Sequence, residues 1–340
     1  MKSWARTSVM ALVLLTLPCW VAALGGPAWV RYVDFALLYA MLALGLNVVV
    51  GFAGLLDLGY IAFYAVGAYT YALLSSPQLG WHAPSLLVLA LCPLLAALAG
   101  LLLGAPTLKL RGDYLAIVTL GFGEIVRLFL NNLDQPINIT NGPQGISMID
   151  ALHWGTWQAS DGLNLGIGHL DAAATFYFIA LTVLVGMAVL TWRLQHSHIG
   201  RAWVALREDE LAAAAMGVPR RNTKLLAFAL GASLGGLAGG LFAAFQGFVS
   251  PESFSLMESI MVLCMVVLGG MGHIAGVITG AVLLTLVPEM LRSLTPYLGV
   301  GIAPENLRML VFGAALVLMM ILRPQGLWPS PLRAREWRHD

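Results

Sequence analysis

Charge is scarce in this sequence of 340 residues. Only 10% of them are Asp, Glu, Lys or Arg, whereas a soluble domain has about 25%. The hydrophobic share is 59% and the mean hydropathy is +0.83. A soluble fold cannot hide so much apolar surface, so the composition predicts an all-α protein that crosses a membrane several times. The formal net charge of +1 argues against nucleic acid or an acidic substrate as the main partner.

Sequence motifs for catalysis are missing as well. There is no G-x-x-x-x-G-K-[ST] stretch, so the chain has no P-loop with which to bind ATP, and neither H-E-x-x-H nor G-x-S-x-G occurs. The three cysteines, Cys19, Cys92 and Cys264, lie inside apolar runs and are expected to pack rather than to bind metal or form disulfides. We expect no catalytic residue, metal or cofactor on this chain, which leaves transporters, channels and membrane scaffolds.

Long apolar segments are present in their place. The first, within residues 1–24, has Lys2 and Arg6 before it, and we interpret it as an uncleaved helix rather than a signal peptide cut near Val21–Ala23. Each segment has close to the ~20 residues that cross a bilayer, although some are short enough to be half-spans. The sequence therefore predicts about ten (8–10) transmembrane helices in one domain, 1–340. The further segments lie near residues 33–50, 55–75, 85–104, 113–133, 173–192, 224–247, 256–272, 274–291 and 305–322.

The basic residues indicate the orientation. With both termini in the cytoplasm, fourteen of the 18 Lys and Arg residues fall inside, in the N-terminal stretch, the 109–111 loop, the 193–224 loop and the 323–340 tail. The 134–172 loop has no Lys or Arg and is expected outside. This outer loop is either a docking face or lid, or a solvated connector anchored at the interface by Trp154 and Trp157.

The loop at 193–224 is the one substantial polar interruption. We expect a short helix within it at 201–217, because apolar and acidic residues recur at three- and four-residue spacing and four alanines follow. Gly217 and Pro219 supply a stop for this helix. A cytoplasmic helix between two spans is a plausible contact for another protein. The periodic residues are Trp203, Leu206, Glu210, Leu211 and Ala214.

Two membrane segments carry more than packing requires. Residues 44–68 combine five glycines with Asn47 and Asp57, which permits a broken helix that lines a pathway or simply close helix packing. Glu124 and Arg127 lie three residues apart on one helix face. An unpaired charge at the membrane centre costs about 2.5–3.5 kcal/mol on insertion scales, so we expect the two to pair. They either line a path or fix the helix in the bundle.

Four blocks of the sequence are similar to one family. Over residues 30–322, the chain resembles the permease subunits of bacterial branched-chain amino acid ABC importers, with the blocks in the order expected for that family. The resemblance implies an ABC importer permease fold in the bacterial inner membrane, with a cytoplasmic coupling helix in the 193–224 loop. The blocks are GLNVVVGFAGLLDLGYIAFYAVGAYTYALL, LRGDYLAIVTLGFGEIVRLFLNN followed by NITNGPQGIS, IGRAWVALREDELAAAAMGVPRRNTKLLAF, and ESIMVLCMVVLGGMGHIAGVITGAVLL.

The resemblance also implies partners. A second related permease subunit would complete the path for a small amino acid, two cytoplasmic ATPase subunits would bind ATP and Mg²⁺, and a periplasmic binding protein would deliver the substrate. The family signature E-A-A-x-x-x-G is only partly kept, because Leu211 stands where Glu is expected. We expect Arg220, Arg221 and Lys224 to meet lipid headgroups. The implied ATPase contacts are Arg201, Arg207, Glu208, Asp209, Glu210, Ala213 and Gly217. From their polarity and glycine content, the residues that we predict to line the path are Asn47, Gly51, Gly54, Tyr60, Tyr114, Glu124 and Arg127.

Two alternatives remain at this stage. A permease for urea or a short amide in the same superfamily would share nearly every motif. A stand-alone secondary transporter or channel would work without an ATPase and would need more paired charges within its spans than this sequence has.

Overall fold

Helices dominate the part of the chain that the computed structural model describes, namely residues 16–18, 20–21, 26–107, 113–135, 138–154, 157–164, 169–298, 310, 313–314, 317–319, 321–323 and 326–328. The expected segments at 1–24 and 305–322 and the 323–340 tail lie largely outside these residues, as do Lys109 and Arg111. The helices are α2 (Pro27–Leu46), α3 (Ile61–Leu74), α4 (Ser85–Thr107), α5 (Asp113–Asn131), α6 (Ala172–His196), α7 (His198–Glu208), α8 (Glu210–Ala215), α9 (Arg220–Gln246), α10 (Leu256–Gly269) and α11 (Ile274–Leu298).

Six described helices are long and apolar enough to cross a membrane: Ala28–Phe52, Ser85–Pro106, Tyr114–Asn131, Ala172–His196, Arg220–Gln246 and Ile274–Ser293. The all-α polytopic architecture is thus confirmed, but the count of about ten spans is not. The expected spans at 55–75 and 256–272 appear as α3 and α10, of 14 residues each, which is less than the ~20 needed. Irregular, glycine-containing backbone precedes α3 and follows α10.

α2 does not end in an ordinary cap. It continues into a π-helical stretch, η1 (Asn47–Phe52), in which all six residues are buried. Residues 53–60 are then irregular until α3 begins. The broken helix that the glycines of 44–68 permitted is therefore present. π-Helical turns within α-helices often mark functional sites.

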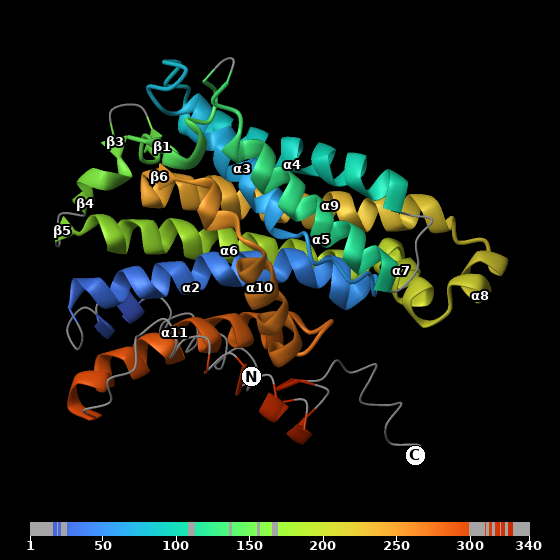
Figure 1. Ribbon diagram of the computed structural model, residues 1–340. Coiled ribbons are helices and arrows are strands. Elements are labelled where there is room, and N and C mark those ends of the chain that lie inside the picture. Colours follow the sequence, from blue (N-terminus) through green and yellow to red (C-terminus); the bar gives the residue numbers. More distant parts are fainter. Residues whose placement is uncertain are drawn as a thin grey trace.

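α9 lies in the middle of the bundle, where it packs against α2, α3 and α4 (Figure 1). Its glycines allow this, because a Cβ at Gly236 would meet the side chain of Ala96 and one at Gly239 would meet the carbonyl oxygen of Tyr64. Close approach through small residues is typical of membrane helices, where lipid provides no hydrophobic drive for association. The small residues of α9 therefore set its close packing against α4 and α3.

The two polar loops lie at opposite ends of the bundle (Figure 1). At one end, the described part of the outer loop forms short antiparallel pairs: β1 (Ile146–Ser147) with β6 (Phe248–Val249), β2 (His153–Trp154) with β3 (Trp157–Gln158), and β4 (Leu163–Asn164) with β5 (His169–Leu170). The 3-10 turns η2 (Gly142–Gln144) and η3 (Ala159–Asp161) lie in the same loop, and η4 (Pro251–Phe254) follows β6. At the other end, α7 and α8 form the 193–224 loop. This separation agrees with the two sides predicted from the basic residues.

Candidate functional site

The 193–224 loop folds as two helices rather than the single one expected at 201–217. Asp209 separates them with an extended backbone (φ −149°). Its carboxylate oxygen accepts hydrogen bonds from the backbone nitrogens of Leu211 (2.8 Å) and Ala212 (3.0 Å), and so caps the first turn of α8. A short acidic side chain competes for backbone donors in this way, which favours a helix start over a helix interior. The same two bonds lower the pKa of Asp209 below its usual range.

The stop predicted at the end of this loop is present. Gly217 adopts a left-handed backbone (φ +87°), and its nitrogen donates to the carbonyl of Ala214 at 3.0 Å. The next nitrogen, that of Val218, donates to Ala213 at 3.0 Å. A left-handed glycine that redirects these donors to the last free carbonyls is a common way to end a helix.

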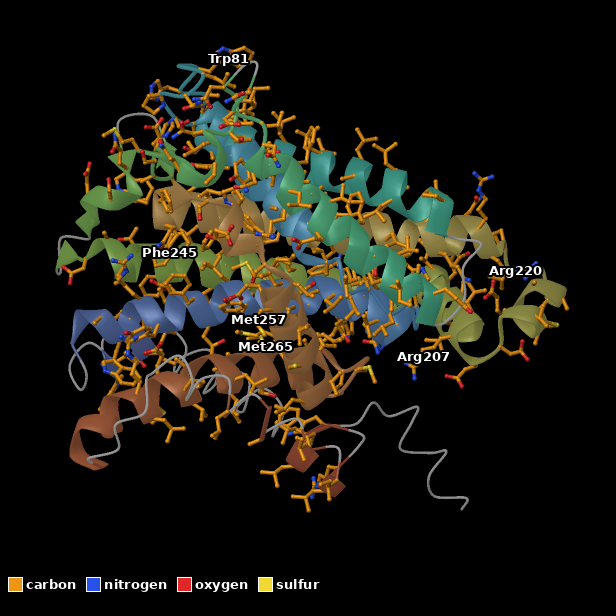
Figure 2. The ribbon with its side chains drawn as sticks, viewed as in Figure 1. Trp81, Arg207, Arg220, Phe245, Met257 and Met265 are labelled. Atoms are coloured by element: carbon orange, nitrogen blue, oxygen red, sulfur yellow. The ribbon has the colours of Figure 1, made fainter. Side chains whose placement is uncertain are left out.

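α7 faces the bundle. Trp203 is fully buried, and its indole nitrogen donates to the carbonyl oxygen of Thr223 in α9 at 2.8 Å. Arg207 reaches η1, where its guanidinium donates to the carbonyl oxygen of Gly51 at 2.6 Å. The coupling role predicted for Arg207 remains a prediction. Arg207 lies near the α7 end of the bundle (Figure 2), and its guanidinium is hydrogen-bonded to the broken helix.

α8 faces outward. Leu211 is 63% exposed and Met216 is 85% exposed, whereas Ala213 is the one residue of α8 that is buried. Exposed apolar side chains gathered at the tip of a polar loop are typical of a surface that another protein covers. Of the other predicted contacts, Arg201, Glu208, Asp209 and Gly217 are exposed and Glu210 is half-buried.

The basic residues after α8 do not all lie where expected. Lys224 is buried, and its ammonium group lies 2.8 Å from the Glu210 carboxylate. Arg220 lies 3.8 Å from the same carboxylate. The assignment of Lys224 to lipid headgroups is therefore wrong, because the side chain ties the start of α9 to the start of α8. Arg221 is exposed.

The predicted path residues on the broken helix are packed against their own chain. Asn47 is fully buried, and its side-chain oxygen accepts from the nitrogen of Gly272, between α10 and α11, at 2.8 Å. Tyr60 is also fully buried, with its hydroxyl donating to the carbonyl oxygen of Gly231 at 3.0 Å. Gly51 and Gly54 form the contact with Arg207, and a Cβ at Gly54 would meet its side-chain stem. A path-lining role for these residues remains a prediction.

The predicted path residues on α5 are exposed or half-buried, and Tyr114 lies ten residues before Glu124. Tyr114 is 71% exposed. Arg127 pairs with Glu124 at 2.5 Å, as their spacing predicted, and also with Glu252 of η4 at 3.1 Å. Sequence reasoning missed Glu252, because 125 positions separate it from Arg127 and no spacing connects the two.

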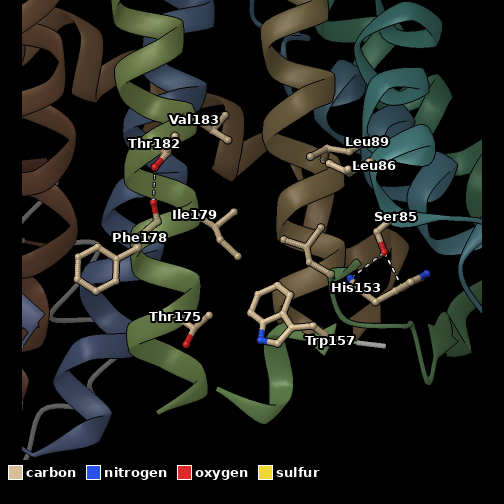
Figure 3. A pocket seen from close by; sticks show the side chains of 11 residues that line it. Ser85, Leu86, Leu89, His153, Trp157, Thr175, Phe178, Ile179, Thr182 and Val183 are labelled. Atoms are coloured by element: carbon tan, nitrogen blue, oxygen red, sulfur yellow. Dashed lines mark hydrogen bonds between the residues drawn. The ribbon is translucent and has the colours of Figure 1, made fainter. Parts of the chain in front are cut away.

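A cavity of 450 Å³ opens at the outer-loop end, between α4, the β2–β3 hairpin and α6 (Figure 3). At its rim, Ser85 and His153 form a side-chain hydrogen bond of 2.6 Å. No predicted path residue lines this cavity, and its walls are apolar. Within the described residues, no three His, Cys, Asp or Glu side chains are grouped to hold a metal ion.

These features define a helical, polytopic membrane protein with an interrupted core and an exposed polar loop at 193–224, as in a transport permease. The family model described as "Branched-chain amino acid transport system / permease component" matches residues 30–320, and the chain belongs to that family. The membership covers nearly the whole region in which the resemblance was noted.

Individual relatives of the chain are also permeases for branched-chain amino acids by name. The chain is 48% identical over 306 residues to the high-affinity branched-chain amino acid transport system permease protein LivM of Escherichia coli (strain K12), covering 86% of this chain and 68% of the relative. It is 28% identical over 277 residues to a probable LivM of Methanocaldococcus jannaschii, covering 78% and 74%. It is 24% identical over 298 residues to the permease protein LivH of Escherichia coli (strain K12), covering 86% and 92%. No solved structure matches the chain significantly.

Proposed function

We propose that this chain is the membrane-spanning subunit of an ABC importer that moves leucine, isoleucine and valine across the bacterial inner membrane. The observation that carries the proposal is the 48% identity to a permease named for branched-chain amino acid transport, extending over 86% of this chain. Two related permeases are named for the same transport system in one organism, which supports a second permease subunit beside this one. ATP and Mg²⁺ would bind to the ATPase subunits.

The ATPase contact is assigned to α8 and the residues that flank it. Leu211 and Met216 form an exposed apolar tip, and Glu208 and Asp209 beside it are exposed acids. Apolar anchors with a charged rim are typical of a surface that docks into a groove on a partner. Both termini are assigned to the cytoplasm with this loop, and a periplasmic binding protein would approach the outer loop.

Mechanistically, closure of the ATPase dimer would push on α8, and α7 would pass the motion to the bundle. Two contacts support this route: Trp203 donates to Thr223 of α9, and Arg207 donates to Gly51 of η1. Alternating access by rocking of helices around a fixed site is a common solution in membrane transporters.

Reconstitution tests the proposal. The chain is placed in liposomes with the second permease subunit, with or without the ATPase subunits, and uptake of labelled leucine is measured in the presence of the binding protein and ATP. We expect uptake only with all components and only with ATP. A further sample contains this chain alone, and uptake by it, or uptake without the ATPase subunits, would overturn the proposal in favour of a secondary transporter or channel.

The substrate is tested in the same liposomes. Unlabelled isoleucine and valine should compete with leucine, and urea and acetamide should not. Competition by urea instead would leave the importer intact and reassign its substrate.

A further inference from the structure

The cavity between α4 and α6 plays no part in the proposed mechanism. Its volume of 450 Å³ is within the range of small-molecule sites in proteins. Its polar and apolar groups are separated along the bundle (Figure 3): Ser85, His153 and Thr175 lie toward the outer loop, and Leu89 and Val183 lie deeper. The cavity is therefore polar at its outer end and apolar along its depth.

A buried hydroxyl at the outer end of this cavity is unbonded. Thr175 is 2% exposed, and its hydroxyl has no hydrogen-bond partner among the residues that the structure describes. By contrast, Ser85 and His153 bond to each other at 2.6 Å, and the hydroxyl of Thr182 donates to the carbonyl oxygen of Phe178 at 2.8 Å. A buried polar group without a partner costs free energy. The Thr175 hydroxyl thus indicates a ligand that brings a hydrogen-bonding group to this point.

The rest of the cavity indicates that this ligand is mainly apolar. An ordered water needs about two to four polar partners, whereas the walls around Thr175 are mostly apolar. They include Leu86, Leu89 and Ile179. Burial of hydrocarbon against such walls is favourable. The ligand is therefore expected to carry one polar group above a hydrocarbon chain.

The unbonded hydroxyl lies close to the membrane interface. α6 has 25 residues, which is about 38 Å at 1.5 Å per residue, against a hydrocarbon core of about 30 Å. The first turn of α6 is thus expected at the level of the interface. Thr175 is about 4.5 Å along the axis from the first residue, Ala172, and Val183 is about 12 Å further. The cavity consequently runs from the interface into the hydrocarbon region.

The cavity opens to the outside of the bundle. Leu86 lines it and is 52% exposed. The end toward the outer loop is bounded by the β2–β3 hairpin, where the indole nitrogen of Trp157 donates to the carbonyl oxygen of Gly162 at 3.1 Å and so holds the ring at the cavity wall. α4 and α6 are both candidate membrane spans, and α4 contains no charged residue. The opening therefore lies at membrane depth.

We propose that this cavity binds a phospholipid of the surrounding bilayer. One acyl chain enters between α4 and α6 and lies against Leu89, Ile179 and Val183, and the hydroxyl of Thr175 donates to the ester carbonyl oxygen at the top of the chain. A phospholipid has its polar ester at the interface and its hydrocarbon below, in the same order as the cavity. The lipid fills a gap that exists because α4 packs on α9 whereas α6 packs on α2. The inference does not depend on which substrate the permease moves.

Lipid photolabelling tests the inference. The permease is purified from its membrane with the subunits that accompany it and is reconstituted with phosphatidylethanolamine that has a diazirine on one acyl chain. Unlabelled lipid is then added in excess, and samples are illuminated at intervals. We expect labelling of Ile179 in the cavity to persist after labelling has been lost at Val185 on the same helix and at Leu94 on α4. These two controls are 51% and 65% exposed, and lipid in contact with them exchanges freely.

Two variants give the inference a second readout, which is the number of lipids that native mass spectrometry finds on the purified permease. Ile179→Trp fills the cavity and should remove the retained lipid, whereas Val185→Trp is the matched control on the outward side of α6. Thr175→Val keeps the shape of the side chain without its hydroxyl. Lipid should bind roughly two- to tenfold more weakly to this variant, as expected for the loss of one hydrogen bond. The lipid-free variant should be at least as stable as the native protein, since it has lost an unbonded buried hydroxyl.

Four outcomes would overturn the inference. The first is equal exchange at Ile179 and at the two controls, with no retained lipid. The second is unchanged lipid binding in both Ile179→Trp and Thr175→Val, which would place the lipid elsewhere. The third is displacement of the photolabel by excess leucine, which would make the cavity a site for an amino acid. The fourth is a cross-link from p-benzoylphenylalanine at position 179 to an accompanying subunit, which would make this surface a subunit contact.

Discussion

α7 and α8 are neighbours in the 193–224 loop, yet they meet the rest of the molecule in opposite ways. α7 buries Trp203 completely and sends Arg207 into hydrogen-bonding contact with the bundle. α8 buries Ala213, and Leu211 on α8 and Met216 directly after it are exposed to solvent. α7 therefore fixes the loop to the bundle, whereas α8 leaves apolar side chains exposed to solvent. Substitutions in the two helices should consequently separate stability from coupling.

The largest loss of stability is expected from Trp203→Ala. The substitution removes a fully buried indole and its hydrogen bond to the carbonyl of Thr223. Large-to-small changes of buried Trp cost about 3–5 kcal/mol. The purified permease should unfold at a clearly lower temperature, and less of it should reach the membrane. Leu211→Ala in α8 is the control, and an equal loss in that variant would contradict an anchored α7.

A smaller loss is expected from Arg207→Ala. The change leaves the carbonyl of Gly51 without its 2.6 Å partner, and hydrogen bonds to charged groups contribute about 1.5–3 kcal/mol. Because the bond joins α7 to η1, ATP hydrolysis should continue while leucine uptake per ATP falls. Arg201→Ala is the matched control, since the Arg201 guanidinium is exposed and donates to the carbonyl of His196, just before its own helix. If leucine uptake per ATP is unchanged in Arg207→Ala, the contact between α7 and η1 does not transmit motion from the ATPase.

The cap at Asp209 should give a still smaller effect that depends on pH. Backbone hydrogen bonds from Ala212 and Leu211 lower the pKa of Asp209 in the folded loop. A carboxylate whose pKa falls on folding stabilises the fold above its unfolded pKa, and this contribution is lost as pH falls through the folded pKa. The protection of the α8 amides against hydrogen exchange, measured relative to the intrinsic exchange rate at each pH, should therefore fall under acid. Asp209→Asn keeps an acceptor without the charge, and the acid dependence should disappear in that variant.

Much of the helical pattern was predictable because long apolar runs must span a bilayer. Where the prediction failed, a local polar group or glycine overrode the average. Asp209 has helical neighbours on both sides, but its side chain caps the following helix more favourably than it continues the preceding one. The glycine-containing backbone beside α3 and α10 likewise shortens two expected spans to 14 residues.

Long-range pairs were the part of the candidate site that the sequence could not reveal. Glu124 and Arg127 were predictable as a pair, because helix geometry fixes three-residue neighbours. Glu252 joins them only through the tertiary fold. Burial has the same limit, since the hydrogen bond that the Asn47 side chain accepts from the Gly272 nitrogen joins residues 225 positions apart.

The smallest effect on stability is expected from Leu211→Asp in α8, although this change should abolish ATPase binding and leucine uptake. The leucine side chain is 63% exposed and outside the buried core, and surface substitutions of this kind usually change stability by less than about 0.5 kcal/mol. If α8 seats in a groove on the ATPase, an added charge at its apolar tip would be desolvated without a partner, and the ATPase should dissociate. Copurification of the ATPase with the permease measures this, and thermal unfolding of the permease alone measures stability. Retained ATPase with normal uptake would show that α8 is not the contact, whereas a lowered unfolding temperature would show that α8 also fixes the loop to the bundle.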